Sequence, residues 1–208
     1  MKRIAILLVL GIALLMTGCT VKVPYNFTYT GNVISDLPLA GQPVQTETVV
    51  INHKGEVIHT VHAQGLAKVL EDAARKNGLN VAPTDDLKVK MTTTFPDWHG
   101  PYSFKPLALR ELARAFVPFG GVFMDEHYRL QTIFNVDFEL IRNGTTVVTK
   151  HYEVNEEKKV AVPPTNDGTR QMLTEVINLW ESNRDKTIES FFASLKELPP
   201  DKVALLTQ

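Results

Sequence analysis

Two histidines and two acidic pairs are of the residue types that bind metals or carry out acid–base catalysis. His59 and His62 form a His-x-x-His pair, and Asp85-Asp86 and Glu156-Glu157 are adjacent carboxylates. A metal site needs several ligands aimed at one point, whereas residues three apart on a strand point to opposite faces. No cysteine or carboxylate cluster stands beside the histidines, and the acidic pairs fall where solvated turns are expected. We therefore expect no metal, no cofactor and no catalytic role for these groups.

Cys19 is the only cysteine, and its surroundings predict a different chemistry. Lys2 and Arg3 precede an apolar run from Ile4 to Met16, and Thr17-Gly18 stand just before the cysteine. A basic start, a short apolar core and small residues before a cut are typical of a secretory signal peptide. The apolar run of 13 residues is too short for a membrane-spanning helix, which needs about 20. The alternative is an incidental thiol inside a signal that is cut elsewhere.

The place of Cys19 after these residues makes the segment resemble a bacterial lipoprotein signal. The resemblance implies that the thiol is acylated with diacylglycerol, that the chain is cut before Cys19, and that the cysteine, further acylated with palmitate, becomes the lipidated N-terminus. Thr20 implies sorting to the outer membrane, because lipoproteins retained in the inner membrane usually have aspartate there. We expect a lipid-anchored protein on the periplasmic face of the outer membrane.

The rest of the chain has the composition of an ordinary globular domain. Removal of residues 1–18 leaves 190 of the 208 residues, enough for a packed core without disulfides. Since Lys2 and Arg3 are removed too, 20 basic and 23 acidic residues remain, a net charge of −3. Such a chain has no basic field to hold nucleic acid and no polybasic patch for anionic lipids. We expect contact with the membrane through acylated Cys19.

An aromatic stretch between residues 95 and 104 is the one unusual surface candidate. Two prolines and a glycine predict a loop there. Exposed aromatic side chains on a loop are typical of sites that recognise proteins or glycans. The alternative is a plug folded back over the core, because large aromatic patches rarely stay exposed. The candidate residues are Phe95, Trp98, His99, Tyr102 and Phe104.

The chain divides into four parts. Residues 1–18 are the signal, and residues 19–43 are expected to be the lipidated N-terminus and a tether, because proline and glycine recur in them. Residues 44–198 are expected to form a single domain, followed by a tail at 199–208. Fully extended, the tether would reach about 80 Å.

Local patterns predict the first elements of the domain. Two β-prone runs, Thr46–Asn52 and Glu56–Val61, flank a glycine-bearing connection and predict a hairpin. An apolar stripe from Leu66 to Ala73 predicts an amphipathic helix that ends at Asn77-Gly78. Alternation from Leu87 to Met91 predicts a half-buried strand.

The second half combines a helix, a long hairpin and a final helix. Pro106 is expected to begin the first helix. Asn143-Gly144 predicts a type I′ turn between strands at about 128–154, with Asp137 opposite Lys150. An apolar side from Met172 to Leu195 predicts the last helix, which the polar stretch 181–186 would kink or split. The predicted fold class is therefore α+β: an antiparallel or mixed sheet with two to three helices packed on one face.

The order of these elements resembles the YajG-type family of small Gram-negative outer-membrane lipoproteins. The likeness is clearest from Leu66 to Met91 and from Tyr128 to about Leu195, which includes Lys150-His151-Tyr152. The family has no established enzymatic activity, so the resemblance implies a non-enzymatic accessory or interaction domain of the cell envelope. Its partner would be an envelope protein or assembly. Two other interpretations stay open: a periplasmic ligand-binding module for a lipid or glycan, held between helix and sheet, and an unrecognised hydrolase.

Overall fold

The computed structural model describes residues 23–58, 61–84, 86–96, 100–107 and 125–207. The strands of this part are β1 (Pro43–Asn52), β2 (Asn80–Val81), β3 (Leu87–Phe95), β4 (Tyr102–Pro106), β5 (Glu126–Arg142) and β6 (Thr145–Val162). The helices are α2 (Val61–Lys76), α4 (Asn166–Leu195) and α5 (Pro200–Thr207). The strands form one mixed sheet, so the predicted α+β class is confirmed.

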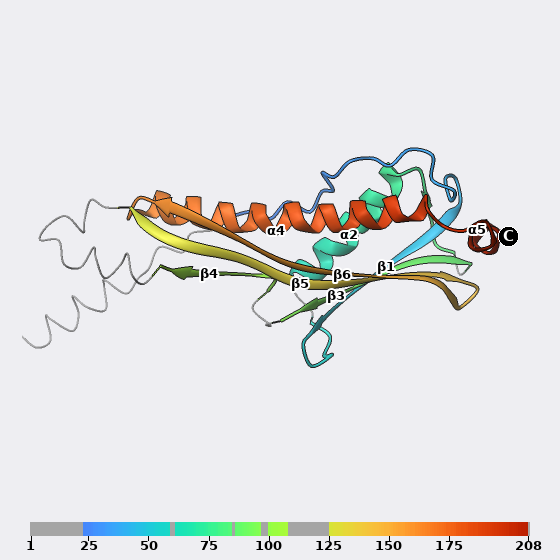
Figure 1. Ribbon diagram of the computed structural model, residues 1–208, viewed down its shortest axis with the longest axis horizontal. Helices are drawn as coiled ribbons and strands as arrows, with labels where there is room; N and C mark the ends of the chain where they lie inside the picture. The colour runs from blue at the N-terminus through green and yellow to red at the C-terminus, as the bar shows by residue number, and fades with distance from the viewer. Residues whose placement is uncertain (1–22, 59–60, 85, 97–99, 108–124, 208) are drawn as a thin grey trace, which may run out of the picture.

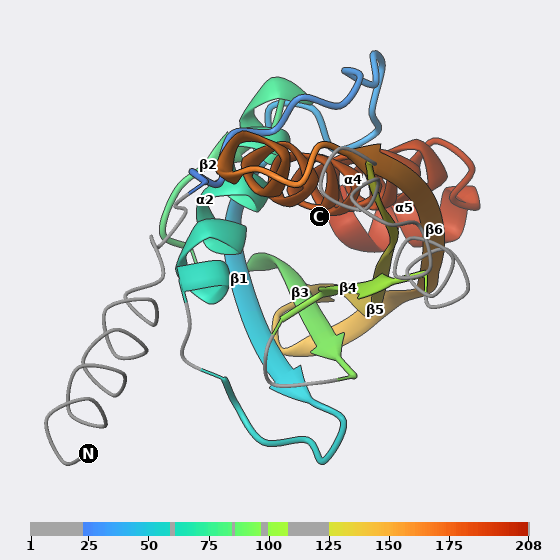
Figure 2. The ribbon, with the colours of Figure 1, turned by 90° about the vertical axis from the view of Figure 1, so that its left-hand side faces the viewer.

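β5 organises the sheet. One edge of β5 pairs with β6 along its whole length. The other edge pairs with β4 at residues 128–132 and with β3 at residues 135–142, so β4 and β3 follow one another along it. β1 is parallel to β3 and, at its start, to β2. Figure 2 shows the sheet curling beneath the helices.

The molecule is drawn out along α4. Figure 1 shows α4 lying along the β5–β6 hairpin, with β4 toward one end of the long axis and α5 at the other. We call the end formed by β4, the start of β5, the end of β6 and the first half of α4 the arm. Its interior is a separate group of buried side chains, here called the arm cluster. The arm cluster consists of Leu130, Val162, Met172, Val176 and Ile177.

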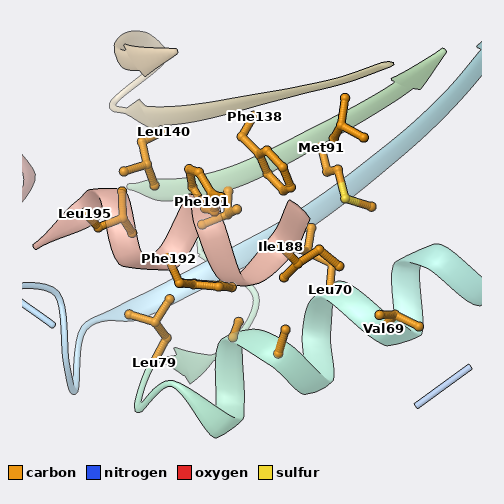
Figure 3. Packing of buried hydrophobic residues seen from close by; sticks show 14 of the residues in the cluster. Val69, Leu70, Leu79, Met91, Phe138, Leu140, Ile188, Phe191, Phe192 and Leu195 are labelled. Carbon is orange, nitrogen blue, oxygen red and sulfur yellow. The ribbon is translucent and has the colours of Figure 1, made fainter. Parts of the chain in front are cut away.

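The main core lies between the sheet and the two helices α2 and α4. Alternate residues of β5 from Leu130 to Leu140 are buried, as the sequence predicts for one face of a strand. Phe138 of this face stacks on Phe191 of α4, with ring centroids 4.3 Å apart. Ile188 of α4 lies next to Leu70 of α2 (Figure 3), and both belong to the same core cluster as Phe138. Helices α2 and α4 therefore share one apolar layer.

The first predicted hairpin is wrong in its second half. β1 ends at Asn52, whose side-chain oxygen accepts the backbone N–H of Glu56 at 3.0 Å and closes a turn. A single bridge joins Ile51 to Val57, which is 55% exposed, and α2 begins at Val61. β1 pairs instead with β3 in parallel over eight residues. The helix α2 is therefore the crossover that a parallel pair requires.

The predicted end of α2 is confirmed. Gly78 has a φ of 81°, and the N–H of Leu79 reaches back to the carbonyl of Ala74 at 3.0 Å. Glycine adopts this left-handed conformation without a steric penalty. The chain then enters the short strand β2.

The long hairpin is confirmed, with one shift in its register. Asn143 and Gly144 have positive φ values of 51° and 76°, as a type I′ turn requires. A register shift between Leu140 and Ile141 then displaces by one residue every pair that lies farther from the turn. Asp137 therefore lies opposite His151, and the predicted pair with Lys150 is wrong. A bulge of this kind inserts one residue into a strand without a distinctive composition.

α4 runs without interruption from Asn166 to Leu195, so the predicted kink or split at 181–186 is wrong. Arg184 and Asp185, in the middle of this polar stretch, are each 3% exposed. The stretch is polar because it contacts polar groups elsewhere in the chain.

Residues predicted as a tail form α5. Leu206 of α5 is fully buried, and the ammonium of Lys202 donates to the carbonyl of Val147 in β6 at 2.6 Å. Helix α5 is thus packed on the domain. Pro106 is the last residue of β4, paired with Tyr128, so it does not begin a helix. The rest of the helix predicted after Pro106 lies outside the described residues.

The predicted tether is also packed on the domain over most of its length. Tyr29, Leu37 and Leu39 are buried, and among the described residues the first strand or helix begins at Pro43. Proline and glycine predict the irregular backbone correctly, but irregular backbone can still have fixed partners. We call residues 23–34 the strap.

Candidate functional site

The strap lies along α4 and is held there by a row of carboxylates. The row occupies positions four residues apart, so its members share one face of the helix. Three backbone N–H groups of the strap each donate a hydrogen bond to one of these carboxylates. The pairs are Asn26 with Glu181, Thr30 with Asp185 and Asn32 with Glu189, at 2.5, 2.8 and 3.1 Å.

Helix α2 holds the strap from the other side. The backbone N–H of Tyr29 donates to Asp72 at 3.0 Å, and the ammonium of Lys76 donates to the carbonyl of Tyr29. The N–H of Ile34 donates to the side-chain oxygen of Asn77 at 2.6 Å. The strap is therefore fixed between two helices. We call the side chains that hold it the clamp: Asp72, Lys76, Asn77, Glu181, Arg184, Asp185 and Glu189.

Arg184 and Asp185 form the buried centre of the clamp. Their Nε and Oδ1 atoms lie 2.8 Å apart, and both side chains are almost fully buried. The remaining guanidinium nitrogens donate to the carbonyls of Asn26 and Thr28, and the guanidinium lies over the ring of Trp180. A buried ion pair is tolerated only when its other hydrogen-bonding positions are also filled. Here the strap backbone fills them.

Close steric fit supports these hydrogen bonds. Phe27 packs directly on Gly65 of α2, where an added Cβ would lie 1.9 Å from the phenyl ring. At Gly31 an added Cβ would lie 2.4 Å from the hydroxyl of Tyr29. That hydroxyl donates to the carbonyl of Asn32 at 3.0 Å, and burial raises the pKa of Tyr29 above its ordinary value. Glycine is needed at both positions because any side chain would push the strap away.

The strap runs parallel to α4, and its N-terminal end lies in the arm. Asn32 contacts Glu189, Asn26 contacts Glu181, and Val23 packs against the arm cluster. Between them the hydroxyl of Tyr25 is hydrogen bonded to the hydroxyl of Tyr102 in β4. The strap therefore joins the β4 side of the arm to α4.

The structure describes three of the five aromatic-stretch residues, and their surroundings differ. Phe95 ends β3 and is 1% exposed, so it belongs to the core. Tyr102 and Phe104 lie in β4, where a loop was predicted. Tyr102 is half-buried against the strap, and Phe104 is 44% exposed. Trp98 and His99 lie outside the described residues. Phe95 therefore fits the interpretation of an aromatic residue packed into the core, whereas Phe104 fits that of an exposed aromatic residue.

The candidate acid–base and metal groups do not come together in the described part of the chain. Glu156 and Glu157 are exposed on β6, where they pair with Thr132 and Gln131. Asp85, His59 and the side chain of His62 are outside the described residues. Within the described ranges no three His, Cys, Asp or Glu side chains are grouped so as to hold a metal ion.

One titratable group on the outer face of the sheet was not predicted. His151 Nδ1 lies 2.7 Å from Asp137, and its Nε2 lies 3.4 Å from Glu153. Hydrogen bonds to these two carboxylates raise the pKa of His151. The shifted register creates this cluster, because it places His151 opposite Asp137.

The space between the helices and the sheet bears on the ligand-binding interpretation. An enclosed cavity lined by Leu66, Met91, Phe134, Trp180 and Ile188, among others, holds only about 10 Å³. This is close to the room one water needs. The larger hollows are open grooves on the surface, such as one of about 440 Å³ beside Asp72. An acyl chain or sugar does not fit into this cavity.

The position of Arg184 in the sequence indicates that a clamp residue is buried. Arg184 follows Trp180 by four residues and precedes Ile188 by four, so it lies on the buried stripe of α4. A charged residue on a buried stripe must find a partner in the interior. The position thus marks a buried polar contact, although nothing local identifies the strap, 156 and 158 residues away in sequence, as the partner.

Comparisons with known proteins found likenesses of fold only. No protein-family model matches the chain, and no curated protein matches it. Rare lipoprotein B from Shewanella oneidensis superposes with a TM-score of 0.37 and 15% identity over 72% of this chain and 96% of that one. A Xanthomonas campestris protein of the family DUF330 gives 0.43 and 8%, over 85% and 98%. A Helicobacter pylori homolog of the neuraminyllactose-binding hemagglutinin gives 0.41 and 11%, over 88% and 95%.

None of the helices in the described residues is both long enough and apolar enough to cross a membrane.

Proposed function

We propose that this chain is a lipid-anchored, non-enzymatic domain of the bacterial periplasm, attached to the outer membrane through acylated Cys19. We further propose that it binds an envelope protein or assembly, as an accessory component. The observation that carries the proposal is the clamp. It fixes the segment that follows Cys19 onto the domain, and it presents no free nucleophile or acid–base pair.

The clamp sets how far the domain stands from its anchor. Val23 is only the fourth residue after Cys19, and it already packs against the arm cluster. Four residues span at most about 14 Å. The composition of residues 19–43 predicted a reach several times longer. The domain is therefore held beside the bilayer, and a partner must meet it there.

The finer family assignment belongs to this proposal. The order of elements, the Asn143-Gly144 turn and the long helix α4 support a place among YajG-type lipoproteins. Thr20 supports sorting to the outer membrane. The sorting is tested by where the mature protein fractionates in a Gram-negative cell.

The lipid anchor is tested by metabolic labelling with an alkyne fatty acid. The wild-type chain and the Cys19→Ser variant would be expressed side by side, captured by an epitope tag after residue 208, and weighed by mass spectrometry. We expect label and diacylglycerol mass on the wild type alone, with cleavage before Cys19. Equal labelling of Cys19→Ser, or a cleaved wild type without lipid, would remove the proposal.

The interaction role has its own test. Photo-crosslinking residues at exposed positions such as Val33 and Leu205, 59% and 53% exposed, would be introduced into the anchored protein in intact cells. We expect the same crosslinked protein in repeated experiments, and its loss when the anchor is removed by Cys19→Ser. Crosslinks that survive loss of the anchor unchanged would contradict a role that depends on the membrane.

A further inference from the structure

Among the described residues of the arm, a large aromatic side chain is exposed near the end of the strap. Phe104 in β4 is 44% exposed and meets the ring of Tyr128 edge-on, with centroids 6.5 Å apart. Tyr128 is half-buried, and its hydroxyl donates to Glu126 at 2.7 Å. The two rings present an apolar body with a polar rim.

The strand register places Phe104 close to where the strap ends. Phe104 lies opposite Leu130 on β5. Leu130 belongs to the arm cluster, and Val23 packs against that cluster. Since Cys19 is four residues before Val23, it lies within about 14 Å of that point. The proposed lipid and Phe104 are therefore at the same end of the molecule.

The opposite end of α4 lies farther from the arm cluster than the residues next to the anchor can span. From Val176, in the arm cluster, α4 continues to Leu195. At about 1.5 Å per residue this distance is nearly 30 Å, twice the reach of the four anchor residues. Helix α5 lies beyond it (Figure 1), with Leu205 53% exposed.

The charges of the arm do not favour a purely electrostatic contact with lipid. Lys105 and Arg129 are exposed, but Arg129 lies 3.8 Å from Glu157, and Glu126 is also nearby on β5. Signs are mixed, so attraction to anionic headgroups is weak. Aromatic side chains, in contrast, concentrate at the membrane–water interface because their rings are apolar and their edges polar.

We propose that the β4 edge of the arm, with Phe104 at its surface and Tyr128 behind it, lies in the headgroup region of the bilayer that holds the acylated Cys19. The inference rests on the proposed lipid anchor. It adds an orientation: the arm contacts lipid, and α5 points away from the membrane.

A single-thiol probe tests this orientation. In the mature lipoprotein the thiol of Cys19 is blocked, and the chain has no other cysteine. Phe104→Cys would therefore carry a polarity-sensitive fluorophore at one site. The lipidated protein would be placed in vesicles of phosphatidylethanolamine and phosphatidylglycerol containing a nitroxide-headgroup lipid. Leu205→Cys, also exposed, is the matched control.

We expect the probe at position 104 to be quenched at least about threefold more than the probe at position 205, with little change in high salt. Ser103→Cys, one residue away on the other face of β4, should give intermediate quenching. Equal quenching at 104 and 205 in protein that floats with the vesicles would overturn the orientation alone. Failure to float would instead overturn the lipid anchor on which it rests.

Discussion

Thr30 donates both its backbone N–H and its hydroxyl to one carboxylate oxygen of Asp185, at 2.8 and 2.6 Å. The other oxygen of Asp185 accepts from Arg184. Thr30 and Asp185 are 155 positions apart in sequence. One buried side chain therefore joins the segment nearest the proposed anchor to the longest helix of the domain.

Asp185→Ala should destabilise the domain strongly. The change leaves the Arg184 charge buried without its partner, a situation that costs about 3–5 kcal/mol. Urea unfolding of the mature chain measures the loss. The control is Glu175→Gln, which removes an exposed pair with Lys158 and should cost less than about 1 kcal/mol. Similar stabilities of the two variants would show that the clamp is not a buried ionic centre.

Gly65→Ala should displace the strap. The new methyl group would overlap the ring of Phe27, and overpacking of this kind costs about 1–3 kcal/mol. Removing the ring as well, in the double variant Phe27→Ala/Gly65→Ala, should recover part of the loss, because the clash is gone. Additive effects in this cycle would mean that the two residues are not in contact.

Phe95→Ala and Phe104→Ala should differ sharply, although both belong to the predicted aromatic stretch. Phe95 is enclosed in the core, so its truncation should cost about 3–5 kcal/mol. Phe104 is exposed, and its truncation should change stability by less than about 0.5 kcal/mol. Chemical denaturation of both variants checks this. A large loss for Phe104→Ala would place that ring in the core and would also weaken its proposed contact with lipid.

His151 should add a small pH dependence to stability. Its pKa is raised in the folded state by Asp137 and Glu153, above the ordinary value of 6.5. The stabilisation is therefore complete below pH 6.5 and is lost as the pH rises through the folded-state pKa. Because the side chain is half-exposed, we expect less than about 1 kcal/mol.

NMR titration of the imidazole is the direct measurement for His151. Asp137→Asn should move its pKa back toward 6.5, whereas Lys150→Gln, at the position that the unshifted register would have paired, should have little effect. The reverse result would favour the unshifted register.

The fold was largely predictable where a pattern is local. The alternation in β5, the Asn143-Gly144 turn and the end of α2 at Gly78 each depend on residues close in sequence. The bulge beside Leu140 was not predictable, because it changes pairing without changing the pattern of apolar residues. The segment from Glu56 to Val61 was misassigned because its contact with β1 is limited to one bridge, at Val57, and α2 already begins at Val61.

The candidate site was harder to predict for a physical reason. Proline and glycine in residues 19–43 indicate irregular backbone, and irregular backbone is mobile only when it lacks partners. Here the partners are charged residues in the middle of α4. From sequence alone, the same charges at Arg184 and Asp185 suggested an interruption of the helix. The irregular segment and the charges of α4 do not identify each other as partners in the sequence. Only the tertiary structure shows that they are in contact.

The central claim is that the clamp holds the strap in the anchored protein. Hydrogen exchange of the lipidated chain in vesicles, followed by mass spectrometry of peptides covering residues 26–34, measures this directly. We predict that the amides of Tyr29, Thr30 and Ile34 exchange as slowly as those of α4, because each is donated to a clamp side chain. Exchange of these amides at the rate of an unstructured peptide, while α4 stays protected, would contradict the account and restore a free tether.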